Sequence, residues 1–302
     1  MPDVPIRPRR SALFMPGSNA RAIEKARALH CDVVILDLED AVAPDAKADA
    51  RARVLASLAA GGFGHRERVV RVNGLDTPWG HADLVAAATS GAEAVLVPKV
   101  ESGDMVRRVA AVLADAGAPD ALALWVMVET PRAMLDVRDV ASAHPRLGAL
   151  VMGTSDLAKD LHARQSRGRE ALVTGLGLSL LAARAHGLVA LDGVHADIAD
   201  AEGLEAACRQ GAILGFDGKT LVHPSQIDAA NRAFGPEPGE VDRARRIIAA
   251  HAAAMAAGRG VTMVDGRMIE ALHVAEARRL VATADAIAAA EGRSTDAAGV
   301  PT

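Results

Sequence analysis

The sequence predicts an α/β fold: a TIM-type (β/α)8 barrel followed by a C-terminal helical extension. Short apolar runs alternate about eight times with longer amphipathic stretches, which is the pattern of a parallel sheet. An open, doubly wound sheet also fits this alternation. Eight units is the number in a barrel, however, and no Gly-x-Gly-x-x-Gly turn follows the first run. Polar residues also follow nearly every run, where a barrel carries its active site.

Each apolar run along the chain predicts one strand. The first apolar run, Ser11–Met15, ends in the turn cluster Pro16-Gly17-Ser18-Asn19, which is expected to cap a helix starting near Ala20. The second, Val33–Leu38, is almost continuously apolar, as a strand buried on both faces is. The further strands are expected at 68–73, 94–99, 122–128, 149–152, 190–195 and 219–223, with helices between them at 47–59, 104–116 and 171–186 among others.

Two domains are expected, the barrel over residues 1–235 and the helical extension over 236–302. The segment Pro236-Glu237-Pro238-Gly239 breaks the chain after the eighth unit. A helix over 240–257, a linker over 258–265 and a closing helix over 266–290 are predicted to follow. This extension is expected to pack on a neighbouring subunit, or back onto its own barrel.

Composition argues against a nucleic-acid-binding, membrane-spanning or disulfide-rich secreted protein. Half of the 302 residues are hydrophobic but only 2% are aromatic, so the core is expected to be aliphatic. A net charge of −4 provides no basic surface for nucleic acid or an anionic membrane. No run reaches the roughly 18 apolar residues of a membrane span. Without a signal peptide, and with only Cys31 and Cys208, a cytoplasmic protein with reduced thiols is expected.

The carboxyl ends of the predicted strands carry an unusual number of charged and polar residues. Several carboxylates at one barrel mouth would repel one another unless a cation lay among them. Oxygen ligands without a Cys or paired-His pattern favour Mg²⁺ or Mn²⁺ over zinc. The residues concerned are Glu39, Asp40, Arg71, Asn73, Lys99, Glu101, Glu129, Asp156, His195, Asp197, Lys219 and His223.

Structural roles compete with these functional ones. An acidic residue after a strand often caps the next helix, as Asp40 or Asp197 would. Glu129 is less suited to that role because Thr130-Pro131 provides its own cap and first helical residue. The structural alternative for Arg71 is an ion pair with Glu39 or Asp40.

Two catalytic designs fit such a barrel. Lys99 would form a Schiff base with a carbonyl substrate in one design. In the other, a metal polarises the carbonyl and holds an enolate oxygen. The carboxylates favour the second design, in which Arg71 would grip a carboxylate or the enolate oxygen.

The chain resembles a known family, the citrate lyase beta subunit with the malyl-, methylmalyl- and citramalyl-CoA lyases, within the HpcH/HpaI aldolase superfamily. Nine stretches carry the resemblance, in the same order over some 260 residues. They are RSALFMPG (10–17), DVVILDLEDAV (32–42), VRVN (70–73), VPKVES (97–102), VET (128–130), GTSDL (153–157), ALDGVHADIAD (190–200), GFDGKTLVHPSQI (215–227) and VDGRMI (264–269).

The resemblance implies a metal site and a substrate site at the barrel mouth, in trimers or hexamers. Mg²⁺ would lie on Glu129 and Asp156, and Arg71 would bind the substrate's carboxylate or keto acid. Glu39 and Asp40 would hold Arg71 and metal-bound water. The backbone of Gly153, Thr154 and Ser155 would line the substrate carboxylate site.

The family also supplies an acid/base group and a coenzyme site. An Asp from a neighbouring subunit has the first role in the CoA lyases, whereas this chain has Glu270, one methylene longer. That change alters the reach of the proton-transfer group. For coenzyme A, which leaves little trace in the sequence, the expected contacts are Phe14, Pro16 and Lys25.

The function predicted from these residues is retro-Claisen cleavage of a malyl-, citramalyl- or citryl-CoA-type thioester to an acyl-CoA and a 2-oxo acid. Three alternatives stay open. They are a malyl-CoA-type thioesterase, a metal-dependent aldolase of free 2-oxo acids, and a subunit of a citrate lyase complex.

Overall fold

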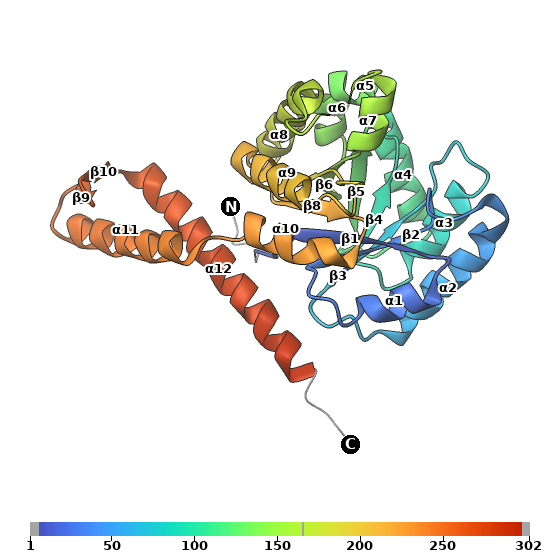
Figure 1. Ribbon diagram of the computed structural model, residues 1–302, viewed down its shortest axis with the longest axis horizontal. Helices are drawn as coiled ribbons and strands as arrows, with labels where there is room; N and C mark the ends of the chain where they lie inside the picture. The colour runs from blue at the N-terminus through green and yellow to red at the C-terminus, as the bar shows by residue number, and fades with distance from the viewer. Residues whose placement is uncertain (1–5, 165, 298–302) are drawn as a thin grey trace. The chain divides into compact units, whose positions relative to one another are not determined.

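Eight parallel strands close into a barrel in the computed structural model, which describes residues 6–164 and 166–297. Each strand pairs with the next along the chain, and the eighth pairs with the first (Figure 1). The predicted (β/α)8 barrel is confirmed. The strands are β1 (Ser11–Pro16), β2 (Val33–Asp37), β3 (Glu67–Arg71), β4 (Ala94–Val97), β5 (Ala123–Val128), β6 (Leu147–Met152), β7 (Val189–Asp192) and β8 (Gly218–Leu221).

Helices surround this barrel and carry the chain back between strands. Side-chain caps begin several of them: Asn19 accepts from the backbone N–H of Ala22, and Thr130 caps a helix with Pro131 at its first position, as predicted. The helices are α1 (Ala20–Ala26), α2 (Lys47–Ala60), α3 (Gly80–Ala88), α4 (Gly103–Asp115), α5 (Pro131–Leu135), α6 (Val137–Ser142), α7 (Thr154–Asp160), α8 (Val173–Ala185), α9 (Ala201–Leu214) and α10 (Ile227–Phe234), with short 3-10 turns η1 (Pro44–Ala46), η2 (Glu170–Leu172) and η3 (Pro224–Gln226).

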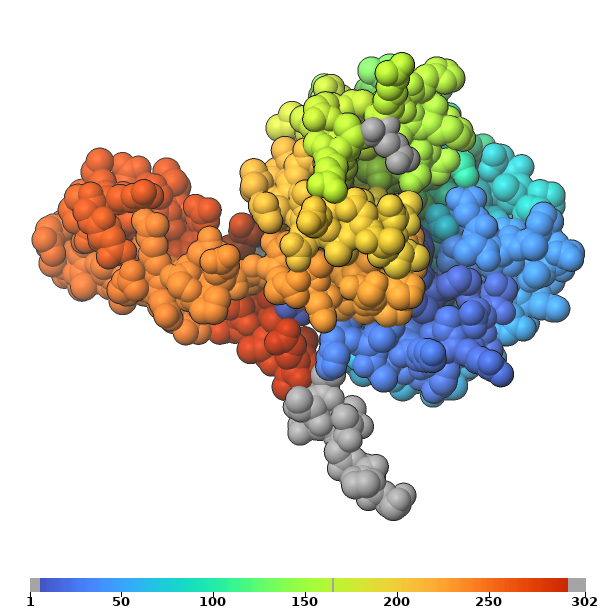
Figure 2. Space-filling view, viewed as in Figure 1, coloured from blue at the N-terminus to red at the C-terminus, as the bar shows by residue number. Residues whose placement is uncertain are grey.

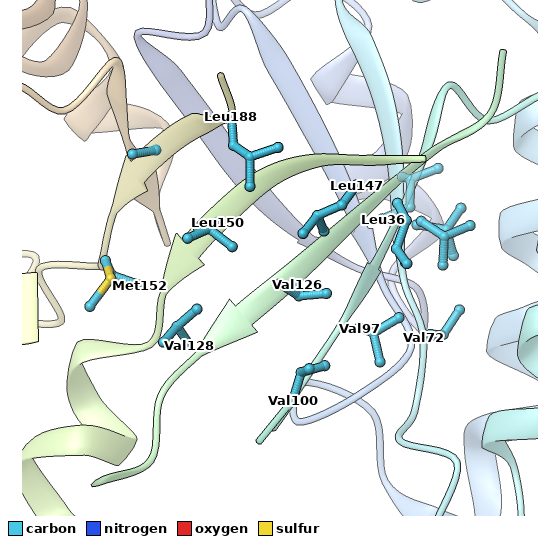
Figure 3. Packing of buried hydrophobic residues seen from close by; sticks show 14 of the residues in the cluster. Leu36, Val72, Val97, Val100, Val126, Val128, Leu147, Leu150, Met152 and Leu188 are labelled. Carbon is cyan, nitrogen blue, oxygen red and sulfur yellow. The ribbon is translucent and has the colours of Figure 1, made fainter. Parts of the chain in front are cut away.

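The apolar side chains form two layers, because successive residues of a strand point to opposite faces. In β2, Val34 and Leu36 belong to the large cluster between the barrel and its helices, whereas Val33 and Ile35 belong to the smaller cluster inside the barrel. Figure 3 shows part of the outer layer, with Leu36 on β2, Val97 on β4, Val126 on β5 and Leu150 on β6. This burial on both faces explains why the strands are nearly continuous apolar runs.

The same alternation selects the side chains at the barrel mouth. Asp37 follows Val33 and Ile35 on the inner side of β2, and Arg71 follows Val69 on the inner side of β3. Asp37 and Arg71 are register partners at the carboxyl ends of the two strands. The fold therefore buries a carboxylate and a guanidinium side by side at the mouth of the barrel.

The segment from Gly235 onwards belongs to a second compact unit, separate from Arg9–Phe234. Helix α11 (Pro238–Ala256) packs along α12 (Ala271–Ala297), and the two are joined by an antiparallel hairpin of β9 (Thr262–Val264) and β10 (Arg267–Ile269). The predicted linker over 258–265 and helix start at 266 are wrong, because the hairpin occupies this stretch. Asp265 and Gly266 form its turn with φ values of 49° and 74°.

No helix among residues 6–164 and 166–297 has the length and apolar character to cross a membrane. Cys31 and Cys208 are both buried free thiols. Burial raises the pKa of both, that of Cys31 to about 12. Neither thiol is therefore suited to act as a nucleophile at neutral pH.

Candidate functional site

Arg71 is the most firmly held side chain at the barrel mouth. Its Nε and Nη2 donate to the two oxygens of Asp37 at 2.7 and 2.8 Å, a bidentate pair. Its Nη1 lies 3.0 Å from Oε2 of Glu39, and the guanidinium stacks 4.6 Å above the centre of the Phe14 ring. Arg71 is thus buried with its orientation set by three neighbours, and few of its N–H groups remain for a substrate.

Asp37 is the residue that the sequence analysis missed. It is 1% exposed, and besides Arg71 it accepts from the backbone N–H groups of Glu39 and Ala41. In the sequence Asp37 lies inside the apolar run VVILDL, where an acid looks like an ordinary strand residue. The signal that identifies it is its place at the end of the run, two residues after the inward-facing Ile35.

Glu39 connects Arg71 to the next cation along the rim. Its Oε1 accepts from Lys99 Nζ at 2.8 Å, while its Oε2 faces Arg71. Burial alone would lower the pKa of Lys99, but the hydrogen bond and charge of Glu39 raise it overall. A lysine with a raised pKa is poorly suited to form a Schiff base at neutral pH, so this geometry disfavours that design.

Glu129 is almost completely buried at the end of β5. Its Oε1 accepts from the backbone N–H of Lys99 at 2.7 Å, and Lys99 adopts a left-handed φ of 52°. Burial raises the pKa of Glu129 to about 7, and the negative charges of Asp156 and Glu39 act in the same direction. The hydrogen bond from the Lys99 N–H lowers this pKa but is outweighed. Ionising the buried Glu129 carboxyl group therefore costs free energy unless a nearby cation compensates its charge.

Gly153 makes room for Glu129. A Cβ at this position would lie 2.2 Å from Oε2 of Glu129 and 2.3 Å from its Cβ. Any side chain here would displace the carboxylate. Thr154 then begins α7, Ser155 is exposed, and Asp156 lies half-buried in the first turn with Lys159 Nζ at 3.6 Å.

These residues fit a divalent cation by charge and by donor type. The group contains four carboxylates, those of Asp37, Glu39, Glu129 and Asp156. Arg71 and Lys99 pair with Asp37 and Glu39, and Lys159 lies 3.6 Å from Asp156, whereas no side chain of the described residues forms an ion pair with the buried Glu129. A cation would compensate that carboxylate, and carboxylate oxygens are the ligands that Mg²⁺ prefers. Within residues 6–164 and 166–297, no three His, Cys, Asp or Glu side chains form a complete ligand set. Glu129 and Asp156 would thus leave other positions to water and substrate.

The sequence also predicts site roles for Asp40, Pro16, Lys25 and Glu270. Asp40 is mostly exposed and approaches Arg71 Nη1 only to 4.0 Å. Pro16 ends β1, and Lys25 is exposed in the last turn of α1. Glu270 is exposed in the second compact unit, directly before α12. The coenzyme contacts and the proton-transfer role of Glu270 remain predictions.

The last two strands supply structural residues. Lys219 is completely buried and pairs with Asp192 at 2.8 Å, so it belongs to the barrel interior. His223 caps η3 and accepts from the backbone N–H of Ser225. Asp200 caps α9, whereas Asp197 accepts from the nearby Ala199 N–H.

Known proteins match this chain over most of its length. The model of the HpcH/HpaI aldolase/citrate lyase family matches residues 10–224. A (3S)-malyl-CoA thioesterase of Cereibacter sphaeroides is 51% identical over 282 residues, covering 93% of this chain and 96% of the relative. An L-malyl-CoA/beta-methylmalyl-CoA lyase of the same species is 34% identical over 312 residues, 95% of this chain and 98% of that protein.

A solved structure extends the likeness to three dimensions. The crystal structure of CitE from Mycobacterium tuberculosis, in complex with magnesium, acetoacetate and coenzyme A, aligns with a TM-score of 0.72 and 32% identity. The alignment covers 91% of this chain and 97% of that one. With its barrel, its strand-end carboxylates and this range of matches, the chain belongs to the HpcH/HpaI aldolase/citrate lyase family.

Proposed function

We propose that this protein hydrolyses a malyl-CoA-type thioester to the free hydroxy acid and coenzyme A, with Mg²⁺ bound at Glu129 and Asp156. The observation that carries the proposal is the 51% identity to a (3S)-malyl-CoA thioesterase over 93% of the chain. This reverses the order predicted from the sequence, in which carbon–carbon bond cleavage came first. The lyase reaction is the second candidate, because a malyl-CoA lyase matches at 34% over almost the same length.

The barrel-mouth residues suit an anionic hydroxyacyl thioester. The chain would hold the cation through Glu129 and Asp156, and when bound the cation would polarise a substrate carbonyl. Arg71 is fixed by Asp37 and Glu39, so its remaining N–H groups would bind a substrate carboxylate without rearrangement of the side chain. Lys99 adds a second positive charge at the rim, tied to Glu39.

Magnesium in a relative's crystal structure supports this cofactor assignment. CitE from Mycobacterium tuberculosis was crystallised with magnesium, acetoacetate and coenzyme A. In the present chain the support comes from the buried Glu129, whose pKa is raised to about 7 by burial and by neighbouring carboxylates. A bound cation would reverse that shift and keep the carboxylate ionised.

Product analysis with purified protein, Mg²⁺ and (3S)-malyl-CoA tests the proposal. Hydrolysis releases a free thiol and malate, and no 2-oxo acid. Retro-Claisen cleavage instead releases glyoxylate and acetyl-CoA, with no free thiol. We expect thiol release that stops when Mg²⁺ is removed with a chelator. Glyoxylate formation without thiol would establish the lyase instead, and no product from malyl-, citramalyl- or citryl-CoA would reject both reactions.

A further inference from the structure

A cavity of about 320 Å³ lies beside the mouth of the barrel, between the residues that follow β6 and those that follow β7. Figure 2 shows these two parts of the chain, in light green and yellow, meeting at the surface. The volume is in the range of small-molecule sites. Residues that line the cavity include Thr154, Ser155, Arg164, Leu172, His195 and Asp200.

His195 is the unusual side chain of this cavity. Its Nε2 is buried and has no hydrogen-bond partner within the described part of the chain. The nearest acid is Asp200, whose Oδ2 lies 3.6 Å away. Buried polar atoms are nearly always satisfied, so an orphaned imidazole nitrogen calls for an explanation. The side chain is nonetheless 21% exposed, so another edge of the ring is open.

The surroundings hold the ring in this orientation. Asp200 caps α9 by accepting from the Gly203 N–H at 3.0 Å. A Cβ on Gly203 would lie 3.0 Å from His195 Cε1 and would collide with Asp200, so only glycine lets both groups approach the helix. The carbonyl of His195 accepts from Gln226 Nε2 at 2.8 Å. The His195 backbone and the Asp200 carboxylate are thus held by hydrogen bonds, and the imidazole lies against Gly203.

The charged groups around His195 come from three segments. The loop before η2 contributes Arg164, Arg167 and Arg169, and the segment after β7 contributes Asp197 and Asp200; Asp156 follows Ser155 in α7. Arg169 is committed to Asp192 at 2.8 Å, and Arg167 lies 3.7 Å from Asp200. Arg164 makes no ion pair with the described residues. Of the three guanidinium groups at the cavity, that of Arg164 is therefore the one available to an anionic acyl group or a developing oxyanion.

We propose that His195, oriented by Asp200, is the general base of thioester hydrolysis; this inference rests on the proposed function. Thr154 and Ser155 line both this cavity and the predicted site of the substrate carboxylate, so the acyl carbon would lie at the cavity's edge. In this step Nδ1, the ring nitrogen that does not face Asp200, removes a proton from a water molecule as the water oxygen bonds to the thioester carbonyl carbon. The carbon–sulfur bond then breaks, and the leaving thiolate takes that proton. An imidazole aligned by a carboxylate is a recurring arrangement for this step.

His195→Asn in the full-length protein with Mg²⁺ is the first test. Thiol release from (3S)-malyl-CoA should fall about 100-fold in kcat with little change in KM, since general-base catalysis contributes on this scale. The rise of the hydrolysis rate with pH that deprotonation of an imidazole produces should disappear. D200N keeps an oxygen to cap α9 and should lose about tenfold, as carboxylates that orient a catalytic histidine do. His186→Asn, an exposed histidine at the end of α8, is the matched control and should keep full activity.

The outcomes separate the two claims. If the wild-type protein hydrolyses none of the thioesters, the proposed function falls and this assignment falls with it. If the wild-type protein is active and H195N keeps its rate and pH profile, only the assignment of His195 is overturned. Any 2-oxo acid released in the same reactions should be unaffected by H195N, because carbon–carbon cleavage needs no activated water. Thermal unfolding curves check that each variant is folded. If H195N has a lowered melting temperature, the same kinetic measurements are made on H195Q and D200N.

Discussion

Glu129 shows how one buried side chain links stability to metal binding. Burial and the charges of Asp156 and Glu39 outweigh the hydrogen bond from Lys99, and they raise its pKa from 4.5 to about 7. Between these two values the folded metal-free protein binds one proton more than the unfolded chain. The contribution of Glu129 to the free energy of unfolding is therefore fully present below about pH 4.5 and is lost as the pH rises through 7.

Replacing Glu129 by Gln should stabilise the metal-free protein. The neutral amide avoids burying a charge and still accepts from the Lys99 N–H. At pH 8 we expect E129Q to unfold with a free energy about 1–3 kcal/mol higher than wild type, and with a much smaller difference at pH 5. Denaturant titrations with a chelator present measure this. Added Mg²⁺ should stabilise only the wild type; an equal gain in both proteins would contradict binding at Glu129.

Gly153 is required by a close approach rather than by backbone freedom. A methyl group there would meet Glu129 at 2.2–2.3 Å, well inside van der Waals contact. We expect Gly153→Ala to move the Glu129 carboxylate and to lower kcat/KM at least tenfold, with weaker Mg²⁺ binding by calorimetry. Gly177→Ala is the control, because nothing lies within 4 Å of a Cβ at that helical position. Equal activity of the two variants would argue against a role for the Gly153 contact.

At the scale of elements, the pairing of β2 with β3 places Asp37 directly beside Arg71. Asp37→Asn would leave a buried guanidinium without its bidentate partner. Such a loss costs about 3–5 kcal/mol in other proteins. Asp40→Asn is the matched control, since Asp40 is 63% exposed and 4.0 Å from Arg71, and should change stability by less than about 0.5 kcal/mol. Urea denaturation of both variants makes the comparison, and similar losses would show that Asp37 does not hold Arg71.

The barrel was predictable because its strands are buried on both faces and its helices on one, so each element leaves its own periodicity in the sequence. The positions of Arg71, Glu39 and Glu129 at strand ends were predictable for the same reason, since each lies at or just after the end of an apolar run; their roles stay predictions. Asp37 was not found, because an acid inside such a run looks like a strand residue until the inward face is known. His195 was recognised at the end of its strand, but its orphaned nitrogen and its cavity are properties of packing alone.

The hairpin of the extension was missed for a different reason. Its strands have three residues each, too short for a clear alternation of polar and apolar side chains. The available signal was Asp265-Gly266, a dipeptide that readily adopts the positive φ values of a tight hairpin turn. Turn chemistry was therefore more informative here than hydrophobic periodicity.

At the scale of the whole molecule, the hairpin presents apolar side chains without cover in the single chain. Met263 and Met268 are register partners on β9 and β10, and they are 61% and 57% exposed. Leu272, at the start of α12, is 63% exposed. Adjacent exposed side chains of this kind mark interaction surfaces more often than isolated ones do. They support the prediction that the extension packs on a neighbouring subunit.

The double variant M263E/M268E should therefore dissociate the assembly. Two carboxylates on one face of the hairpin would carry uncompensated charge into any interface that buries it. Light scattering after size-exclusion chromatography should give a trimer or hexamer for the wild type and a monomer for the variant. L181E/I213E adds the same charge at residues that are 72% and 78% exposed on α8 and α9 and should keep the wild-type mass. Because Glu270 lies two residues after Met268, the monomer should also lose activity if a neighbour supplies that carboxylate. A monomeric wild type, or an unchanged mass for M263E/M268E, would show that this hairpin holds no subunits together.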